Sequence, residues 1–172
     1  AYHSEGTCTF YGTANTNQLI AEAMGFQLPG AAFTPTDSPI RNCLNNESLR
    51  SLIRMMDAEM GLGEMLDVKN WVNAIIVLLA SGGSTNLVIH LIAMARSAGY
   101  IITIEDFNDL SSMIPLLCRI YPNGNADVNE FHSEGGIARL LKNLIDGELI
   151  YEDIHTVAGL GLSHYTKVPT IG

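Results

Sequence analysis

Two apolar segments joined by a glycine-rich turn constrain the fold of this chain most. Residues 71–80 are apolar on nearly every side apart from Asn73, and residues 87–98 form a second, almost uncharged stretch. A helix that is apolar all round is buried in a core. Two such helices, separated by residues 81–86 with the sequence SGGSTN, are expected at the centre of a large domain.

The remaining pattern predicts mostly α-helix and few short strands. Residues 28–46 contain Pro29, Pro35 and Pro39 and are expected to form an irregular loop. Residues 100–104 fit a strand or an extended lead-in. Helices are expected over residues 14–24 (capped by Thr13 or Asn15), 48–60 (with Leu49, Leu52, Ile53 and Met56 on one face), 67–80 (capped by Asp67), 87–98, 128–132 and 136–146. Both an all-α fold and the helical part of an α/β parent domain fit, and the buried helices favour the latter.

Composition indicates a segment of something larger. Hydrophobic residues make up 47% of the 172 positions and charged residues only 16%. The chain begins at Ala1 and ends without a charged tail. We therefore expect an internal part of a longer polypeptide.

Charge and cysteine usage exclude several classes of protein. The net charge is −9 and the nine basic residues are scattered, so no nucleic-acid partner is expected. The longest apolar run, residues 74–80, is too short to cross a membrane. Cysteines at positions 8, 43 and 118 are odd in number and widely spaced, which predicts no disulfide framework and a cytoplasmic location.

Cys8 is the main candidate for chemistry. It lies between Gly6 and small hydroxyl residues, just before a predicted helix. Small neighbours let the backbone approach a ligand closely, so Cys8 could face a metal cluster or a substrate. The alternative is a buried cysteine that acts as a small apolar residue, and Cys43 and Cys118 are expected to be of that kind.

Two further groups of residues each allow a functional and a structural role. Ser84, Thr85 and Asn86 precede a buried helix and either bind an anion through free backbone N–H groups or simply cap the helix. His90 is expected to be a hydrogen-bonded core residue. His132, next to Glu130 and Glu134, is either catalytic or part of a solvated face.

Three motifs resemble the dehydratase family that contains dihydroxy-acid dehydratase and 6-phosphogluconate dehydratase. They are GTCTFYGTANTNQ at residues 6–18, LASGGSTN at 79–86 followed by His90 and Leu91, and RIYPNGNADVNEFHSEGG at 119–136. The resemblance runs nearly end to end, including TVAGLGLSHYT at 156–166, and covers a middle portion of a full-length member. TCTFYGTAN, LPG at 28–30 and DSPIR at 37–41 resemble the phosphogluconate branch in particular.

The resemblance implies an iron–sulfur hydro-lyase that converts 6-phosphogluconate to 2-keto-3-deoxy-6-phosphogluconate in the Entner–Doudoroff pathway. Its cluster would be 4Fe-4S rather than 2Fe-2S, with Cys8 as the third cysteine ligand and the other two ligands upstream of Ala1. Cluster iron would activate the C3 hydroxyl while a base removes the C2 proton. Ser84, Thr85 and Asn86 would line the substrate site.

The family also implies features that this stretch does not carry itself. A magnesium site and the catalytic base would lie in motifs that the chain lacks, so residues 1–172 alone are expected to be inactive. They would form an internal part of the N-terminal α/β domain of a cytoplasmic homodimer, with no separate second domain. The alternatives are a dihydroxy-acid or other sugar-acid dehydratase, and a helical module without catalysis.

Overall fold

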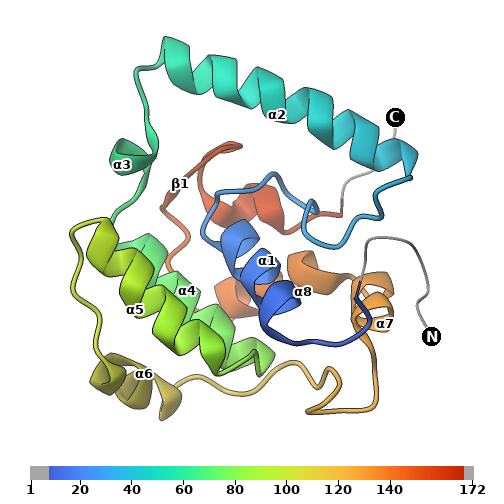
Figure 1. Cartoon of the computed structure of the whole chain (residues 1–172), viewed down its shortest axis with the longest axis vertical. Coiled ribbons are helices and arrows are strands. Elements are labelled where there is room, and N and C mark those ends of the chain that lie inside the picture. The colour runs from blue at the N-terminus through green and yellow to red at the C-terminus, as the bar shows by residue number, and fades with distance from the viewer. Residues whose placement is uncertain (1–7, 169–172) are drawn as a thin grey trace.

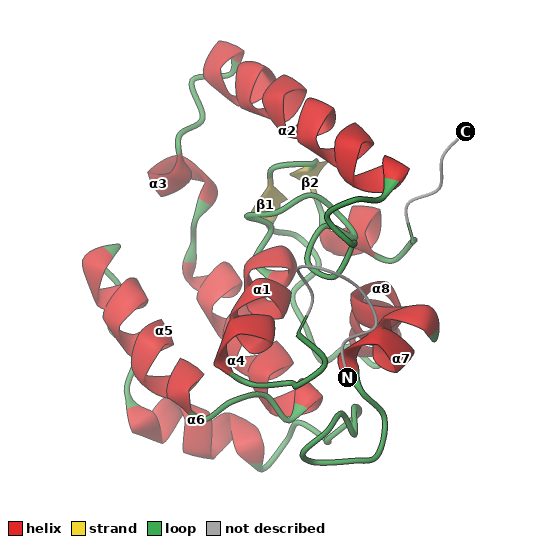
Figure 2. Ribbon diagram, turned by 45° about the vertical axis from the view of Figure 1, so that its right-hand side comes forward, coloured by secondary structure: helices red, strands yellow, loops and turns green. Residues whose placement is uncertain are grey.

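The computed structural model describes residues 8–168, which fold into helices around one apolar core (Figure 1). Figure 2 shows how little of the described chain is strand. The elements are α1 Thr13–Ala23, α2 Pro39–Asp57, α3 Leu62–Met65, α4 Val68–Ser81, α5 Asn86–Ser97, α6 Ile104–Ser111, α7 Val128–Ser133, α8 Gly136–Asp146, the strands β1 His155–Thr156 and β2 Gly159–Leu160, and a 3-10 helix at Leu162–Tyr165. The prediction of a mostly helical segment is therefore confirmed.

Helix α4 forms the centre of the core, as its apolar sequence predicts. It packs against α1, α5 and α6. Its N-terminus is fixed by a capping box in which Asp67 accepts from the backbone of Asn70, and Asn70 accepts from the backbone of Asp67. Trp71 and Val77 are almost wholly buried, so the expectation of a buried helix is confirmed here.

Helix α5 differs from the expectation of burial on all sides. It buries one stripe, Leu87, Leu91 and Ala95, against α1 and α4. The opposite side is open, with Ile89 at 69% exposure. His90, expected in the core, is exposed as well. The local sequence predicts the helix correctly, but among the described residues only one face of α5 packs against other helices.

Helix α2 begins nine residues earlier than predicted. Pro39 occupies the first helical position, where a missing N–H costs nothing, and Ser38 accepts a hydrogen bond from the backbone of Arg41. The prolines therefore mark a shorter loop and a helix start rather than irregular structure up to residue 46. The predicted N-cap of α1, Thr13 or Asn15, is also wrong. Gly12 occupies the N-cap position and makes no side-chain hydrogen bond there.

Residues 100–104 form no strand. Thr103 and Asp106 make a capping box that starts α6 at Ile104 instead. The short β1–β2 pair, with His155 opposite Leu160, is the sheet of the described residues. No helix between residues 8 and 168 is long and apolar enough to cross a membrane.

Candidate functional site

The segment that carries Cys8 is fixed to the start of α1 by one buried amide. Asn15 is 4% exposed, and its Nδ2 donates to the carbonyl oxygens of Cys8 and Phe10, both at 2.7 Å. The Cys8 side chain itself is exposed. The buried Asn15 side chain thus holds the backbone at Cys8, while the Cys8 thiol is accessible to solvent.

The SGGSTN turn lies directly against this segment. Tyr11 donates from its buried hydroxyl to Ser81 Oγ at 2.8 Å, and the backbone N–H of Ser84 donates to Thr16 Oγ1 at 3.1 Å. A Cβ added at Gly83 would lie 2.5 Å from Thr16 Cγ2, so only glycine permits this close approach.

A third segment, residues 119–128, completes the arrangement. Tyr11 donates from its backbone to the Tyr121 carbonyl at 3.1 Å, and Val128 does the same to Thr9 at 3.2 Å. Asn123 Nδ2 donates to the Gly82 carbonyl at 2.7 Å. Figure 1 shows the dark-blue segment before α1 beside the loop that leads to α7. We call the meeting of residues 8–16, 81–86 and 119–128 the motif junction; it joins the three motifs of the sequence.

The predicted binding residues meet α1 at the edge of this junction. Ser84 Oγ lies 3.1 Å from Thr13 Oγ1, and Asn86 Nδ2 donates to the same Thr13 oxygen at 2.8 Å. Thr85, the N-cap of α5, makes no side-chain capping bond, and neither does Gly12 at α1. Two helix N-termini, each with a partial positive charge, therefore lie next to one cluster of hydroxyl and amide groups.

The three cysteines are free and differ in their exposure. Cys43 is exposed on α2, whereas Cys118 is buried, and burial raises the pKa of its thiol to about 11. Within residues 8–168 no group of three or more His, Cys, Asp or Glu side chains could hold a metal ion. An iron–sulfur cluster takes several thiolates. The accessible thiol of Cys8 suits one ligand position, but the described residues do not fit a complete cluster.

His132 is not on a fully solvated face. Its ring packs edge-on against Phe33, with ring centroids 6.5 Å apart, and burial lowers its pKa. Its imidazole is half-buried against the loop before α2.

Sequence reasoning missed the buried carboxylate of Glu22. It is 1% exposed, and its two oxygens accept from the backbone N–H groups of Gly30 at 2.6 Å and Ala32 at 2.8 Å. Burial raises its pKa to about 7, while those two hydrogen bonds and the nearby Arg41 act in the opposite direction. Its one detectable signal is an acidic residue inside an otherwise buried helix face.

Comparison with known proteins identifies relatives of this chain by sequence. Residues 1–165 match the family described as dihydroxy-acid/6-phosphogluconate dehydratase, N-terminal. The phosphogluconate dehydratase of Escherichia coli K12 is 52% identical over 172 residues, 98% of this chain and 28% of that protein. The enzyme of the same name from Zymomonas mobilis is 46% identical over 173 residues, 99% of this chain and 28% of that protein.

A relative with another name is more distant. The dihydroxy-acid dehydratase of Sulfurisphaera tokodaii is 36% identical over 154 residues, covering 90% of this chain and 28% of that protein. The chain thus spans little more than a quarter of the length of each of these relatives.

Proposed function

Because this chain belongs to the dihydroxy-acid/6-phosphogluconate dehydratase family, we propose that it is part of a hydro-lyase that removes water from 6-phosphogluconate. The observation that carries the choice of substrate is the difference in identity, 52% to a phosphogluconate dehydratase against 36% to a dihydroxy-acid dehydratase. The product would be 2-keto-3-deoxy-6-phosphogluconate, an intermediate of the Entner–Doudoroff pathway.

Residues 1–172 would be an internal part of the N-terminal domain of this longer enzyme. Three free cysteines are consistent with a reducing cytoplasm. The homodimeric state and a magnesium site in the full-length enzyme rest on the family resemblance. On this proposal the 172 residues alone would be inactive.

Cys8 would supply one ligand of a 4Fe-4S cluster whose other ligands come from outside the described residues. Two features support this role: its thiol is exposed, and Asn15 holds the backbone that carries it. When bound, such a cluster supplies a Lewis acid for the loss of a hydroxyl group.

Ser84, Thr85 and Asn86 would bind and orient the anionic substrate. They combine hydroxyl and amide donors with the N-terminus of α5, and the uncapped N-terminus of α1 adjoins them. Helix N-termini favour negatively charged groups, such as a carboxylate or a phosphate. The role of this chain's residues is therefore to hold the substrate next to the Cys8 segment.

The substrate proposal is tested by assaying the full-length protein for 2-keto acid formation. We expect turnover of 6-phosphogluconate and little turnover of an unphosphorylated dihydroxy acid. The reverse preference would assign the chain to dihydroxy-acid dehydration. Activity on neither substrate, in an iron-free protein purified without oxygen, would favour the helical module without catalysis.

Two pairs of variants test the residues. Cys8→Ser should remove most of the bound iron and the brown colour, whereas Cys43→Ser, at an exposed cysteine on α2, should retain both. Asn86→Ala should raise the KM for the phosphorylated substrate about tenfold, the loss expected for one hydrogen bond to a charged group. Asn45→Ala, an exposed asparagine on α2, is the control. Unchanged iron in Cys8→Ser or unchanged KM in Asn86→Ala would reject the respective role.

A further inference from the structure

Helix α2 carries an apolar stripe that the described residues leave largely exposed. Leu49, Leu52, Ile53 and Met56 follow helical spacing and are 63%, 55%, 57% and 68% exposed. No other helix of the described residues packs extensively against α2. A 19-residue helix receives most of its stability from packing of such a face, so this stripe calls for a partner.

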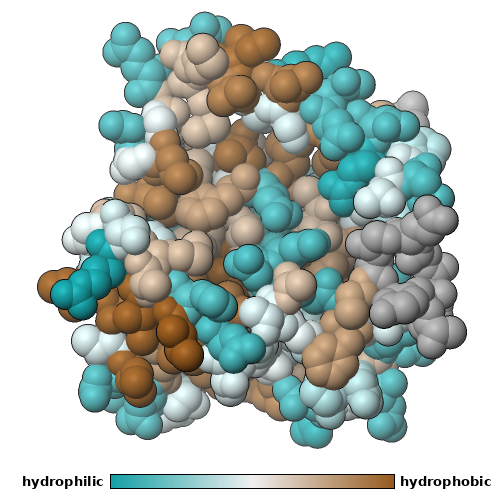
Figure 3. All heavy atoms as spheres, viewed as in Figure 1, coloured by the Kyte–Doolittle hydropathy of each residue, from teal (hydrophilic) through white to brown (hydrophobic). Residues whose placement is uncertain are grey.

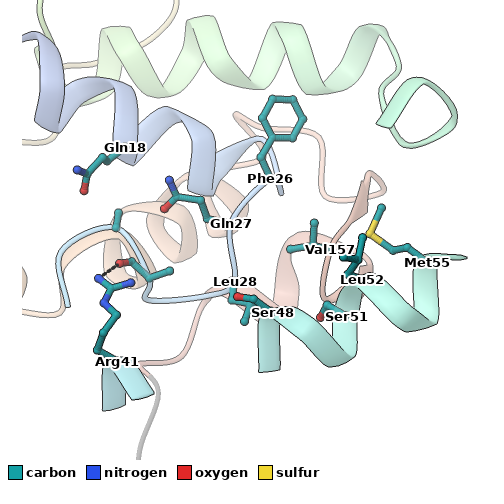
Figure 4. Close-up of a pocket in the computed structure, with 12 residues that line it drawn as sticks. Gln18, Phe26, Gln27, Leu28, Arg41, Ser48, Ser51, Leu52, Met55 and Val157 are labelled. Carbon is teal, nitrogen blue, oxygen red and sulfur yellow. Dashed lines mark hydrogen bonds between the residues drawn. The ribbon is translucent and has the colours of Figure 1, made fainter. Parts of the chain in front are cut away.

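A groove runs between α2 and the body of the molecule. It has a volume of about 470 Å³, and Figure 4 shows Leu52 and Met55 on α2 close to Val157, with Phe26 contributed from beyond α1. Arg41 closes the other end, where its guanidinium donates to the Ala31 carbonyl at 2.7 Å. In Figure 3 apolar side chains gather over α2, with a hollow beneath them.

Hydrogen bonds hold the N-terminal end of α2, and the loop before it, against the body. Glu22 holds the loop at Gly30 and Ala32, and Arg41 binds a carbonyl oxygen of that same loop. Of the residues in α2, Leu44 and Ser51 are the buried ones. The helix is therefore fixed at its N-terminal end, and the groove lies between the body and its later residues Leu52 and Met55.

We propose that the stripe and groove of α2 receive an apolar segment of the same polypeptide, from outside residues 1–172. This inference rests on the proposal that the chain is part of a longer dehydratase. Its relatives have nearly three quarters of their length outside the aligned stretch, which is ample chain to supply such a segment.

Size favours this occupant over a second copy of the chain. The stripe spans eight residues, about 12 Å of helix, and offers far less than the roughly 800 Å² per partner of a stable dimer. A covalently connected segment needs less area because its effective concentration is high.

The test places a photo-crosslinking amino acid, p-benzoylphenylalanine, in the full-length protein at position 52. Position 50, on the polar face of the same helix, is the matched control. We expect position 52 to cross-link to residues outside 1–172, at several times the yield of position 50. Mixing ¹⁴N- and ¹⁵N-labelled protein distinguishes cross-links within one polypeptide from those between copies.

Three results would overturn the proposal. They are cross-links predominantly between labelled and unlabelled copies, cross-links confined to the body of residues 8–168, and a yield at position 52 no higher than at position 50. In parallel, Ile53→Ser should lower the thermal midpoint of the full-length protein, while Arg50→Ser should not. Neither measurement depends on the substrate or on iron, so failure here is distinguishable from failure of the proposed function.

Discussion

The motif junction and helix α2 are stabilised in opposite ways. At the junction, three short segments are joined by hydrogen bonds across large sequence separations, such as Tyr11 to Ser81 and Asn123 to Gly82. Helix α2 is regular and long, yet most of its apolar stripe is exposed. The described residues thus supply the contacts that hold the junction together, but they leave most of the apolar stripe of α2 without packing partners.

If this contrast is correct, tight sites at the junction tolerate substitution far less than sites near α2. A Cβ at Gly124 would lie 1.9 Å from the Arg119 carbonyl oxygen, a backbone atom that cannot move aside cheaply. We expect Gly124→Ala to lower the free energy of unfolding by about 3 kcal/mol or more, measured by urea unfolding.

Gly63 in α3 is the matched control. A Cβ there meets no atom within 4 Å, so Gly63→Ala should be neutral or stabilise the helix by up to about 1 kcal/mol. Similar losses in the two variants would show that the junction is not the better-specified region.

Glu22 connects the two regions and predicts a pH dependence. Its folded-state pKa of about 7 lies above its ordinary value of 4.5, so the folded chain holds the proton that the unfolded chain releases. The resulting stabilisation is complete below pH 4.5 and is lost as the pH rises to 7. At 1.36 kcal/mol per pKa unit the loss is about 3 kcal/mol.

Glu22→Gln isolates this effect. Between pH 4.5 and 7, the wild type should lose more stability in urea unfolding than the variant does. Parallel pH profiles would mean that Glu22 is not the titrating group and that the loop before α2 is held in another way.

Asn15 is expected to have a smaller, more local effect at the junction. Asn15→Ala removes the donor to Cys8 and Phe10 and leaves two carbonyl groups without it, a cost of about 1–3 kcal/mol. Release of the segment should also speed alkylation of Cys8 by iodoacetamide in the iron-free protein, with Cys43 as internal reference.

Asn73 provides a matched comparison for this variant. It is equally buried and holds the backbone of Tyr151 through both a donor and an acceptor. Asn73→Ala should cost similar stability without changing the alkylation of Cys8. If both variants accelerate alkylation alike, general destabilisation rather than anchoring by Asn15 controls the thiol.

The same contrast explains which features were predictable from sequence. Helix α4 was predicted well because its apolar run and its Asp67 cap are local signals. The helical spacing of Leu52 and Ile53 is also a local signal and predicts that they share one face of a helix. Such a pattern does not indicate which residues pack against that face. Pro39 was misread because proline marks both loops and helix starts, and Ser38 decides between them.

The candidate site was predictable only in part. Cys8 and Ser84 were found through their motifs, but their relation through Thr13, Thr16 and Asn15 depends on how α1 meets the turn after α4. Glu22 was missed because its partners are backbone N–H groups of a loop, and backbone groups leave no signature in the sequence.

The smallest effect is expected on the polar face of α2. Glu47 forms exposed ion pairs with Arg54 at 2.8 Å and Arg50 at 3.3 Å, and the hydrogen bond from Arg54 is the main cause of its lowered pKa. Such pairs contribute little because water and salt screen them. Glu47→Gln should therefore leave the thermal midpoint of the full-length protein nearly unchanged at physiological salt. A slight advantage of the wild type should be present above pH 4.5 and lost as the pH falls further. A large, salt-insensitive decrease would mean that this face is buried in the full-length protein, and that α2 is covered on both sides rather than along its apolar stripe.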